Sequence, residues 1–443
     1  MNNEFLMMIK QLIPDRYEEF LESLKKPFHK GFRINSLKIS DEDFFNFFDI
    51  QKSPSVYAKN AYLLLDDKSY GNTIMHKMGL MYLQEVSAAS VVDLLDIKEN
   101  DTVLDMCSAP GGKATQIAQR LNNTGLLVAN EIENNRAIKL LSNIERWGIN
   151  NCIILNDEPA NIANTLYGFF DKILVDAPCS GEGMFRKNDE AILDWSMEHV
   201  NSCHHRQIKI LEEAYKCLKD NGTLVYSTCT LNIIENEKVI EEFVLNHPDI
   251  ELVNIDVDWG MPGFKTTIDT TKCRRLMPFH DTEGHFMAKM IKHHETKTVK
   301  LNILNSKIDS NAYDFIKDNY KDMPKYLYQK NDKVYGGNNP FYDLKKLHII
   351  RNQVLLGEMI KKRFEPHQHF YTSVGFKNIQ SNNLKKYIEL TSDEVISFYQ
   401  GNTLSISGYK GYVGLSYKNI IIGYGKGDNN IIKNKYPKGL RLL

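Results

Sequence analysis

The stretch Leu104-Asp105-Met106-Cys107-Ser108-Ala109-Pro110-Gly111-Gly112-Lys113 begins as an apolar, strand-like run and ends in proline, glycine and lysine. Two later stretches share this pattern: Val175-Asp176-Ala177-Pro178-Cys179-Ser180-Gly181 and Val225-Tyr226-Ser227-Thr228-Cys229-Thr230. An apolar run that opens into small residues is typical of a buried parallel strand followed by a loop. Because ligands bind at the carboxyl ends of strands in open α/β sheets, these three turns predict an enzyme site.

Around these turns the chain alternates between strand and helix patterns. The expected strands are 102–107, 126–131, 152–157, 172–177 and 222–228, and the expected helices are 113–121, 134–147, 203–219 and 235–246. Residues 285–291 are expected to form a late edge strand. Alternation at this pace predicts a Rossmann-like α/β fold with a doubly wound parallel sheet.

The whole-chain totals exclude several classes of protein. At 443 residues the chain is too long for one hydrophobic core. It contains no apolar run long enough to span a bilayer, and its first residues lack a signal-peptide pattern. The seven cysteines include no CxxC pair, which favours reduced thiols and a cytoplasmic location over a disulfide framework. The histidine spacings do not indicate a metal site.

We expect four domains: 1–75, 76–295, 296–365 and 366–443. In the first, residues 25–35 mix basic and aromatic side chains, a composition that suits RNA but equally suits a solvated face over a small core. The last carries ten Lys and Arg against four Asp and Glu, and its short strands are expected at 404–406, 412–416 and 420–424, separated by glycines. A compact basic β-module predicts a polyanionic partner.

The first turn and the acids that follow it indicate a nucleoside site. The Pro-Gly-Gly turn opens the backbone to a ligand at a helix N-terminus, but it is neither a Walker A loop nor GxGxxG. Glu131 and Asp157 end the next two expected strands, where carboxylates can accept from ribose hydroxyls and an adenine amino group. Each acid alone is equally a helix N-cap, and together they favour an adenosine-type ligand.

The second and third turns bring two thiols to neighbouring strand ends. Cys179 and Cys229 lie beside Asp176 and near Lys113, which can lower a thiol pKa. The alternative is a pair of small buried hydrophobes.

Taken together, these motifs resemble the Sun/Fmu superfamily of RNA (cytosine-5) methyltransferases. The resemblance covers roughly residues 25–295, in the Pro-Gly-Gly-Lys turn and in segments 33–38, 176–183, 227–230, 275–278 and 283–286. Segments 425–427 and 433–441 resemble the C-terminal RNA-binding module of an RsmF/YebU-like bacterial branch, which modifies small-subunit ribosomal RNA. Tyr412 stands where this module would have tryptophan.

The resemblance implies a cofactor, a reaction and a set of site residues. Residues 76–295 would be an S-adenosylmethionine-dependent methyltransferase domain, 1–75 an RNA-binding region and 366–443 a PUA-like RNA-binding module. Cys229 would attack C6 of cytosine, Cys179 would assist release, and Asp176 would hold the edge of the base. The implied cofactor residues are Cys107, Ser108, Ala109, Pro110, Gly111, Gly112, Lys113, Glu131, Arg136, Asp157 and Asp176.

Two of the residues considered have equal alternatives. Arg136 can equally be a helix-surface cation, and Arg275 is considered as a contact to RNA phosphate. The implied partner is ribosomal RNA, as naked RNA or within the small subunit, and the chain is expected to act as a monomer without a membrane partner.

Two rival functions stay open. One is a methyltransferase of the same fold that acts on an exocyclic amine or a protein, although such enzymes place Asp/Asn-Pro-Pro-aromatic where this chain has Asp-Ala-Pro-Cys. The other is a non-catalytic RNA-binding or ribosome-assembly factor.

Overall fold

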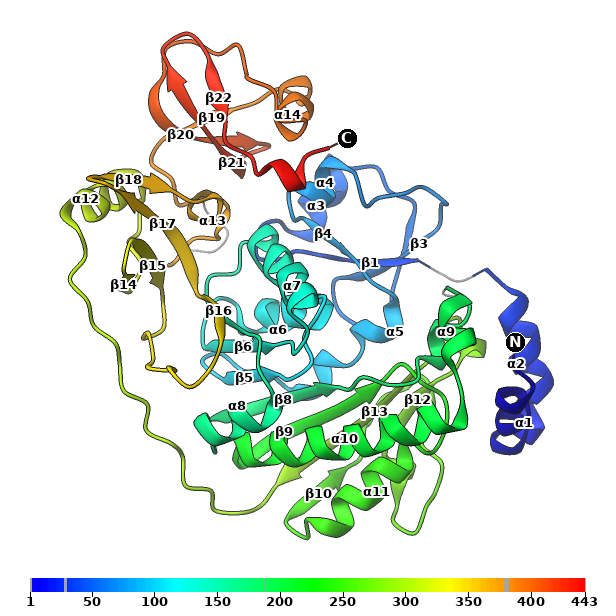
Figure 1. Cartoon of the computed structure of the whole chain (residues 1–443). Helices are drawn as coiled ribbons and strands as arrows, with labels where there is room; N and C mark the ends of the chain where they lie inside the picture. The colour runs from blue at the N-terminus through cyan, green and yellow to red at the C-terminus, as the bar shows by residue number, and fades with distance from the viewer. Residues whose placement is uncertain (1, 28–29, 188, 378–381, 443) are drawn as a thin grey trace.

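The protein is described by a computed structural model that covers residues 2–27, 30–187, 189–377 and 382–442. Its largest unit is a ten-stranded mixed sheet with the strand order β11-β12-β13-β9-β8-β5-β6-β7-β16, to which β10 adds by pairing with β13 (Figure 1). The five parallel strands at its centre are β5 (Thr102–Asp105), β6 (Leu126–Asn130), β7 (Cys152–Leu155), β8 (Phe170–Asp176) and β9 (Leu218–Thr228). The chain order reverses between β5 and β8, which is where an open α/β sheet binds its ligand.

Two hydrophobic cores lie on opposite faces of this sheet. Successive residues of a strand point to opposite faces, so Val103 packs with α6 and α7 while Leu104 packs with α8, α10 and α11. These helices are α6 (Gly112–Leu121), α7 (Asn134–Trp147), α8 (Pro159–Thr165), α10 (Met197–Cys217) and α11 (Glu237–Asn246). The short helices α5 (Val86–Ala89) and α9 (Asp189–Asp194) complete this domain. The expected Rossmann-like fold is therefore confirmed.

The expected edge strand is placed wrongly by the sequence pattern. β13 (His285–Lys292) lies inside the sheet, antiparallel to β9 on one side. On its other side it pairs with β12 (Arg274–Leu276) and β10 (Ile250–Val253), and β11 (Met261–Pro262) extends β12. Its side chains are buried on both faces at most positions, which is the pattern of an internal strand.

Several element boundaries also differ from the expected ones. β5, β6 and β7 end one or two residues earlier than expected, so Glu131 and Asp157 lie in loops. The helix expected at 203–219 begins at Met197, because the side chain of Ser196 caps it by accepting from the backbone of His199.

The N-terminal residues form two separate parts. Helices α1 (Asn3–Leu12) and α2 (Tyr17–Lys25) pack on the large sheet domain, where Phe5 and Phe20 join a cluster with Phe185, Trp195 and Met277. A four-stranded antiparallel sheet follows, in the order β2-β3-β1-β4. Its elements are β1 (Gly31–Ile34), α3 (Asp41–Phe47), β2 (Lys52–Pro54), β3 (Ala61–Leu64), α4 (Ile74–Lys77) and β4 (Met81–Leu83).

In the described part of the basic and aromatic run 25–35, Phe32 is buried and cannot stack on RNA bases, whereas Lys25, Lys26 and Lys30 are exposed. Phe32, Arg33 and Asn35 are buried, whereas Phe28 and His29 lie outside the described residues. The Arg33 guanidinium donates to the carbonyl oxygen of Gly112 at 2.5 Å and to Oγ1 of Thr115 at 2.8 Å. Arg33 therefore supports the first turn of α6 from within the protein core. It does not contact RNA.

The segment after the sheet domain adds both to that sheet and to a smaller one. β16 (Ile349–Asn352) pairs antiparallel with β7 and closes the far edge of the large sheet. The smaller sheet has the order β14-β15-β17-β18. Its elements are α12 (Ser310–Asn319), β14 (Tyr326–Lys330), β15 (Lys333–Gly337), β17 (Val354–Ile360), β18 (Arg363–Pro366) and α13 (Gln368–Thr372).

The C-terminal module is a four-stranded sheet with one helix. Its elements are β19 (Tyr387–Glu389), α14 (Ser392–Tyr399), β20 (Lys410–Tyr417), β21 (Ile420–Asp428) and β22 (Ile432–Asn434). The strand expected at 404–406 is only a single bridge between Leu404 and Ile432. β21 runs through glycines expected to end strands, since a Cβ on Gly425 would lie 2.2 Å from Cγ2 of Ile432. Glycine here permits close packing of β22.

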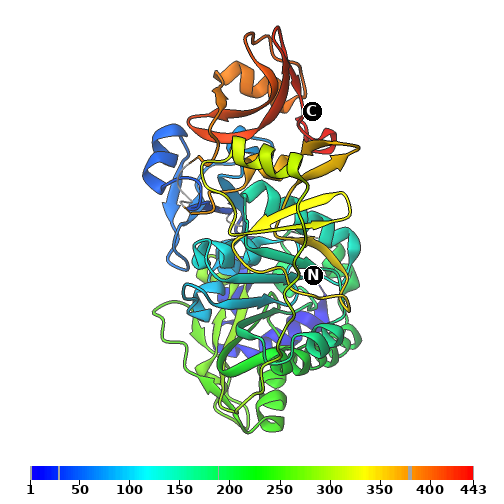
Figure 2. The same cartoon turned by 90° about the vertical axis from the view of Figure 1, so that its left-hand side faces the viewer.

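The C-terminal module packs on the N-terminal sheet, although nearly the whole chain separates them in sequence. Phe32 and Phe44 share one hydrophobic core with Ile388, Phe398 and Val413. Figure 1 shows the module next to α3 and α4, and Figure 2 shows it at one end of the molecule with the large sheet toward the other end. None of the helices in the described ranges is long and apolar enough to cross a membrane.

Candidate active site

The Pro-Gly-Gly turn joins β5 to α6 and is held from two sides. Gly111 has φ +110°, a left-handed conformation that favours glycine. On one side, the backbone N–H of Ser108 donates to the carbonyl oxygen of Asn130 at 2.7 Å. On the other side, Arg136 of α7 donates to the carbonyl oxygen of Ala109 at 3.0 Å, and Asn143 donates to that of Pro110 at 2.7 Å. The turn is therefore a rigid loop at the carboxyl edge of the sheet.

Glu131 lies directly after β6, at the same edge, and is 3% exposed. Its Oε1 accepts from the backbone N–H of Glu133 at 2.9 Å. Its Oε2 lies 3.4 Å from Nη1 of Arg136, so that carboxylate oxygen keeps lone pairs for further donors. Arg136 contacts both Glu131 and Ala109 and is thus more than a surface cation.

Asp157 has partners on both carboxylate oxygens. Oδ1 accepts from the backbone of Glu158 at 2.9 Å and from the Asn161 side chain at 2.7 Å. Oδ2 accepts from the backbone of His348 at 2.8 Å, just before β16. The Asp157 carboxylate therefore joins the start of α8 to the segment that carries β16, although the N-cap residue of this helix is Glu158 and not Asp157.

Asp176 is the centre of a charged cluster at the end of β8. Its Oδ2 accepts from Nζ of Lys113 at 2.8 Å, and its Oδ1 accepts from the Ser227 hydroxyl at 2.7 Å. Nε2 of His285 lies 3.7 Å from the same Oδ1. Burial alone would raise the pKa of Asp176, but Lys113 and His285 outweigh it and hold the pKa well below the ordinary value. The carboxylate is therefore ionised at neutral pH.

The two thiols meet beside this cluster. Sγ of Cys179 lies 3.4 Å from Sγ of Cys229, and no disulfide joins them. Cys107, Cys179 and Cys229 are the half-buried cysteines, whereas the other four are buried. Either sulfur can be the donor in this contact. The contact and the nearby Lys113 lower the pKa of Cys229, against the opposing effects of burial and of the Asp176 charge. The same contact and burial raise the pKa of Cys179.

Asp105, which ends β5, is buried and lies beneath the turn. Burial, together with the negative charge of Asp176, raises the pKa of its carboxyl to about 7, although the Ser108 hydroxyl and Lys113 oppose the rise. Oδ2 accepts from the Ser108 hydroxyl at 2.8 Å, whereas Oδ1 is buried without a partner among the described residues. Such an orphaned acceptor is typical of a site that a polar ligand completes.

Two buried carboxylates cross-link the loops that carry the thiols. Glu182, on the Cys179 loop, accepts through Oε2 from the backbone N–H groups of Leu231 and Asn232, both at 2.8 Å. Glu235, on the Cys229 loop, accepts through Oε2 from the backbone N–H of Ser180 at 2.9 Å. These bonds fix one loop against the other and hence hold the two thiols close together.

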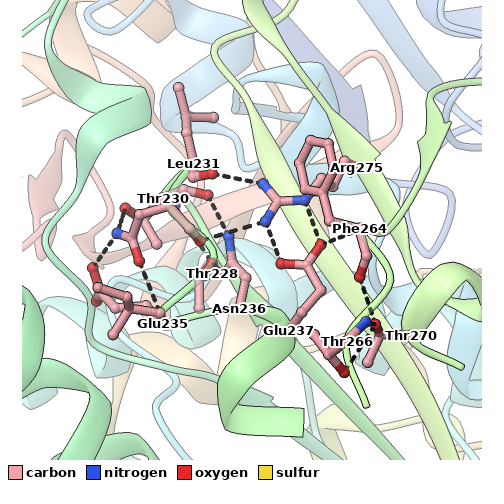
Figure 3. Close-up of polar contacts among 12 residues, drawn as sticks. Thr228, Thr230, Leu231, Glu235, Asn236, Glu237, Phe264, Thr266, Thr270 and Arg275 are labelled. Carbon is pink, nitrogen blue, oxygen red and sulfur yellow. Dashed lines mark hydrogen bonds and ion pairs between the residues drawn. The ribbon is translucent and has the colours of Figure 1, made fainter. Parts of the chain in front are cut away.

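Arg275 continues this network beneath the Cys229 loop, as Figure 3 shows. Its Nε donates to Oε1 of Glu237 at 2.6 Å, its Nη2 pairs with Oε2, and its Nη1 donates to the Leu231 carbonyl oxygen at 2.7 Å. The Arg275 and Glu237 side chains are 1% and 0% exposed. The interpretation of Arg275 as an RNA phosphate contact is therefore wrong, because no phosphate reaches a guanidinium that is buried and paired.

The structure also brings residues to the site that the sequence reasoning missed. Ser227 precedes the third turn and Asp105 precedes the first, and both were quoted within their motifs without a role. His285 opens a segment that was noted only for its family resemblance. Their common signal is position, because each lies at the end or start of a strand that borders β5, β8 or β9.

Family models match nearly the whole chain. Residues 92–291 match the model of 16S rRNA methyltransferase RsmB/F, and residues 1–86 match that of the N-terminal domain of 16S rRNA methyltransferase RsmF. Residues 314–373 match the first C-terminal domain of RsmF rRNA methyltransferase, and residues 385–442 match the methyltransferase RsmF PUA domain.

Full-length relatives agree with these models. The chain is 32% identical to a ribosomal RNA small subunit methyltransferase F of Aeromonas salmonicida, over 99% of this chain and 96% of that protein. It is 31% identical to one of Vibrio parahaemolyticus, over 98% and 96%. The chain belongs to the RsmF family. The resemblance drawn from the motifs is thereby confirmed, including the bacterial branch.

Solved structures show that the RsmF-like sheet domain has known counterparts. A methyltransferase homologue protein from Pyrococcus horikoshii is 33% identical, covers 66% of this chain and 95% of that one, and superposes with a TM-score of 0.59. NSun6 from Pyrococcus horikoshii, solved with SFG, shares the fold with a TM-score of 0.60 at 23% identity, over 66% of this chain and 99% of that one.

Proposed function

We propose that this chain transfers a methyl group from S-adenosylmethionine to C5 of cytosine in small-subunit ribosomal RNA. Membership of the RsmF family supports the methyltransferase activity and the ribosomal RNA substrate. One observation carries the cytosine chemistry: Cys179 and Cys229 lie with their sulfurs 3.4 Å apart at the ends of adjacent strands. Transfer to an amine needs no thiol, which argues against the rival methyltransferase.

The residues at the turn fit this cofactor. The buried Oδ1 of Asp105 lacks a partner in the described chain and suits an ammonium or hydroxyl donor. Glu131 keeps one carboxylate oxygen for ribose hydroxyls. S-adenosylmethionine, when bound, supplies an electrophilic methyl group on a sulfonium. The residues that would surround it are Cys107–Lys113, Glu131 and Arg136. Of the proposed cofactor residues, Asp157 has the least hydrogen-bonding capacity left for a ligand.

The protein groups solve the problem that C5 of cytosine is a poor nucleophile. The Cys229 thiolate adds to C6, the C5–C6 double bond opens, and C5 becomes enamine-like and able to take the methyl group. Asp176 accepts from the cytosine edge, and Lys113 beside it balances the charge that builds on the ring. Water then accepts the C5 proton, the electron pair of the C5–H bond re-forms the C5–C6 double bond, and the C6–S bond breaks to return the Cys229 thiolate.

The electrostatics support these different roles for the two thiols. The contact with Cys179 and the charge of Lys113 lower the pKa of Cys229, which favours the thiolate that the proposed attack needs. The contact with Cys229 and burial raise the pKa of Cys179, so this residue stays a thiol that can donate a hydrogen bond to the leaving sulfur.

A gel assay for protein–RNA adducts tests the reaction. With S-adenosylmethionine and small-subunit ribosomal RNA, Cys229→Ser should neither methylate nor form an adduct, because a hydroxyl is a far weaker nucleophile than a thiolate. Cys179→Ser should methylate and then remain covalently linked to RNA under denaturing conditions. Cys203→Ser, at a buried cysteine on α10, is the matched control and should release its product. An adduct formed by Cys229→Ser would exchange the two roles, and methylation of an exocyclic amine would overturn the proposal.

The finer assignments belong to the same proposal. We propose that 1–75 and 366–443 flank the catalytic region 76–295 as RNA-contacting parts, with 296–365 joining them. The excess of six positive charges in the C-terminal part supports this role. The chain would act as a monomer in the cytoplasm, on naked RNA or on the assembled subunit. A non-catalytic assembly factor is the second candidate, and measured methyl transfer excludes it.

A further inference from the structure

One histidine lies in the catalytic cluster without an assigned role. His285 is the first residue of β13, is 3% exposed, and places Nε2 3.7 Å from Oδ1 of Asp176. This Nε2 is buried and has no hydrogen-bond partner among the described residues. Because β13 pairs antiparallel with β9 and Phe286 faces Thr228, His285 lies at the level of Cys229.

The surroundings of His285 keep its imidazole neutral. The charged groups that act on it are Asp176 of β8, Lys113 of α6 and Glu85 just before α5. Burial lowers the pKa of His285 below its ordinary value, Lys113 lowers it further, and Asp176 and Glu85 oppose this. A neutral imidazole carries one N–H, and the adjacent carboxylate favours the tautomer with that hydrogen on Nε2.

We propose that His285 is a positioning residue of the proposed methyltransferase, whose Nε2–H donates to Asp176 and fixes the carboxylate that addresses the cytosine edge. The gap to a normal hydrogen bond is less than about 1 Å, and catalytic hydrogen bonds are often long before the substrate is bound. Lys113 and Ser227 each take one oxygen of Asp176, and the third donor limits rotation of the carboxylate.

A purely structural histidine is a poorer account of these contacts. A ring that serves only to fill this space would be better as an apolar one, because a buried polar nitrogen without a partner is costly. The nitrogen is directed at the one carboxylate that the proposed chemistry requires. The inference rests on the proposed function, so its test needs one measurement that works without RNA.

The first measurement is nitrogen NMR of the full-length protein with labelled histidine, without RNA. His285→Gln identifies the signal. The expected result is a neutral ring with hydrogen on Nε2 at neutral pH, and a changed Nε2–H signal in Asp176→Asn. The proposal would be overturned by a ring with its hydrogen on Nδ1. It would also be overturned if the His285 signal were the same in Asp176→Asn as in the wild type.

The second measurement is the pH dependence of kcat/KM on ribosomal RNA. His285→Phe keeps the ring volume and removes the donor, so kcat/KM should fall about tenfold, the value of one hydrogen bond to a charged group. Loss of a donor raises the pKa of Asp176, so the acid limb of the profile should move to higher pH. His285→Gln places an amide N–H near the position of Nε2 and should recover most of the activity.

The control is His293→Phe, at an exposed histidine just after the same strand, which should match the wild type. The positioning role would be overturned if the kcat/KM of His285→Phe lay within twofold of the wild-type value and the acid limb of its pH profile did not move. Equal losses in the Phe and Gln variants would do the same, since they would indicate packing alone. A wild-type protein that methylates no RNA would refute the proposed function, and the NMR result would still decide the contact between His285 and Asp176.

Discussion

Replacing Arg275 with methionine should unfold the catalytic domain more readily and leave the RNA phosphate contacts unchanged. The change removes bonds to Glu237 and to the Leu231 carbonyl oxygen, at 2.6 and 2.7 Å, and leaves a carboxylate that is 0% exposed without its counter-charge. Breaking one partner of a buried ion pair costs about 3–5 kcal/mol. The carboxylate keeps only the backbone N–H of Phe264, at 2.9 Å, so we expect a loss within that range.

Urea unfolding followed by tryptophan fluorescence measures this loss. All three tryptophans, Trp147, Trp195 and Trp259, lie in the sheet domain, so the signal reports on the part that contains the pair. Arg274→Met, at the half-buried neighbour, is the control and should cost less than about 1 kcal/mol. The double variant Arg275→Met/Glu237→Leu removes both charges and should recover more than half of the loss, because neither charge is left unpaired.

Salt-dependent RNA binding supplies the result that would refute this reasoning. If Arg275 is buried and paired as the structure shows, Arg275→Met should leave the slope of log K for RNA binding against log salt unchanged. If Arg275→Met kept the wild-type stability and made that slope shallower by about 0.7–0.9, Arg275 would be neutralising a phosphate after all.

Three further outcomes follow from the same geometry. Glu131→Ala should weaken S-adenosylmethionine binding by about 1–3 kcal/mol in calorimetry, and an unchanged affinity would remove Glu131 from the site. Lys426→Gln and Lys435→Gln in the basic module should each make the slope of log K for RNA binding against log salt shallower by about 0.7 for each lost contact, with cofactor affinity unchanged. An unchanged slope would mean that these lysines face solvent and do not contact RNA. Asp105→Asn should flatten the pH dependence of stability. Burial raises the pKa of Asp105 to about 7, so its contribution is present below the unfolded value and is lost as pH rises through 7. The variant should therefore gain stability over wild type at pH 8 and little at pH 5 in urea midpoints, and equal gains at both would contradict this.

The strand–turn–helix order was predictable because its signals are local. The glycines of the first turn, the apolar runs before each thiol and the helical periodicity of 134–147 lie within a few residues of the structure they specify. The same locality explains the errors. A glycine in sequence looks like a strand end, whereas Gly425 lies inside β21 because β22 approaches it closely.

The charge pattern alone could not separate buried from exposed basic residues. Arg33 and Arg275 both looked like nucleic-acid contacts, and both are 1% exposed. Each is paired with groups 38 to 86 positions away in the chain, so no window of sequence contains its partners. By contrast, the net positive charge of residues 366–443 is a sum over the module and needs no partner to be known.

By itself the sequence determined the Rossmann-like sheet, the family and the two thiols, because motif identity and short-range periodicity carry that information. Only the tertiary structure decided that the thiols lie 3.4 Å apart, that Asp176 is shared by Lys113, Ser227 and His285, and that the two ends of the chain share a core. These features depend on strand order, which brings β5, β8, β9 and β13 side by side although up to 190 residues separate them. Loop closure over such lengths is driven by burial of apolar faces, and the pairing that results sets the distances on which the chemistry depends.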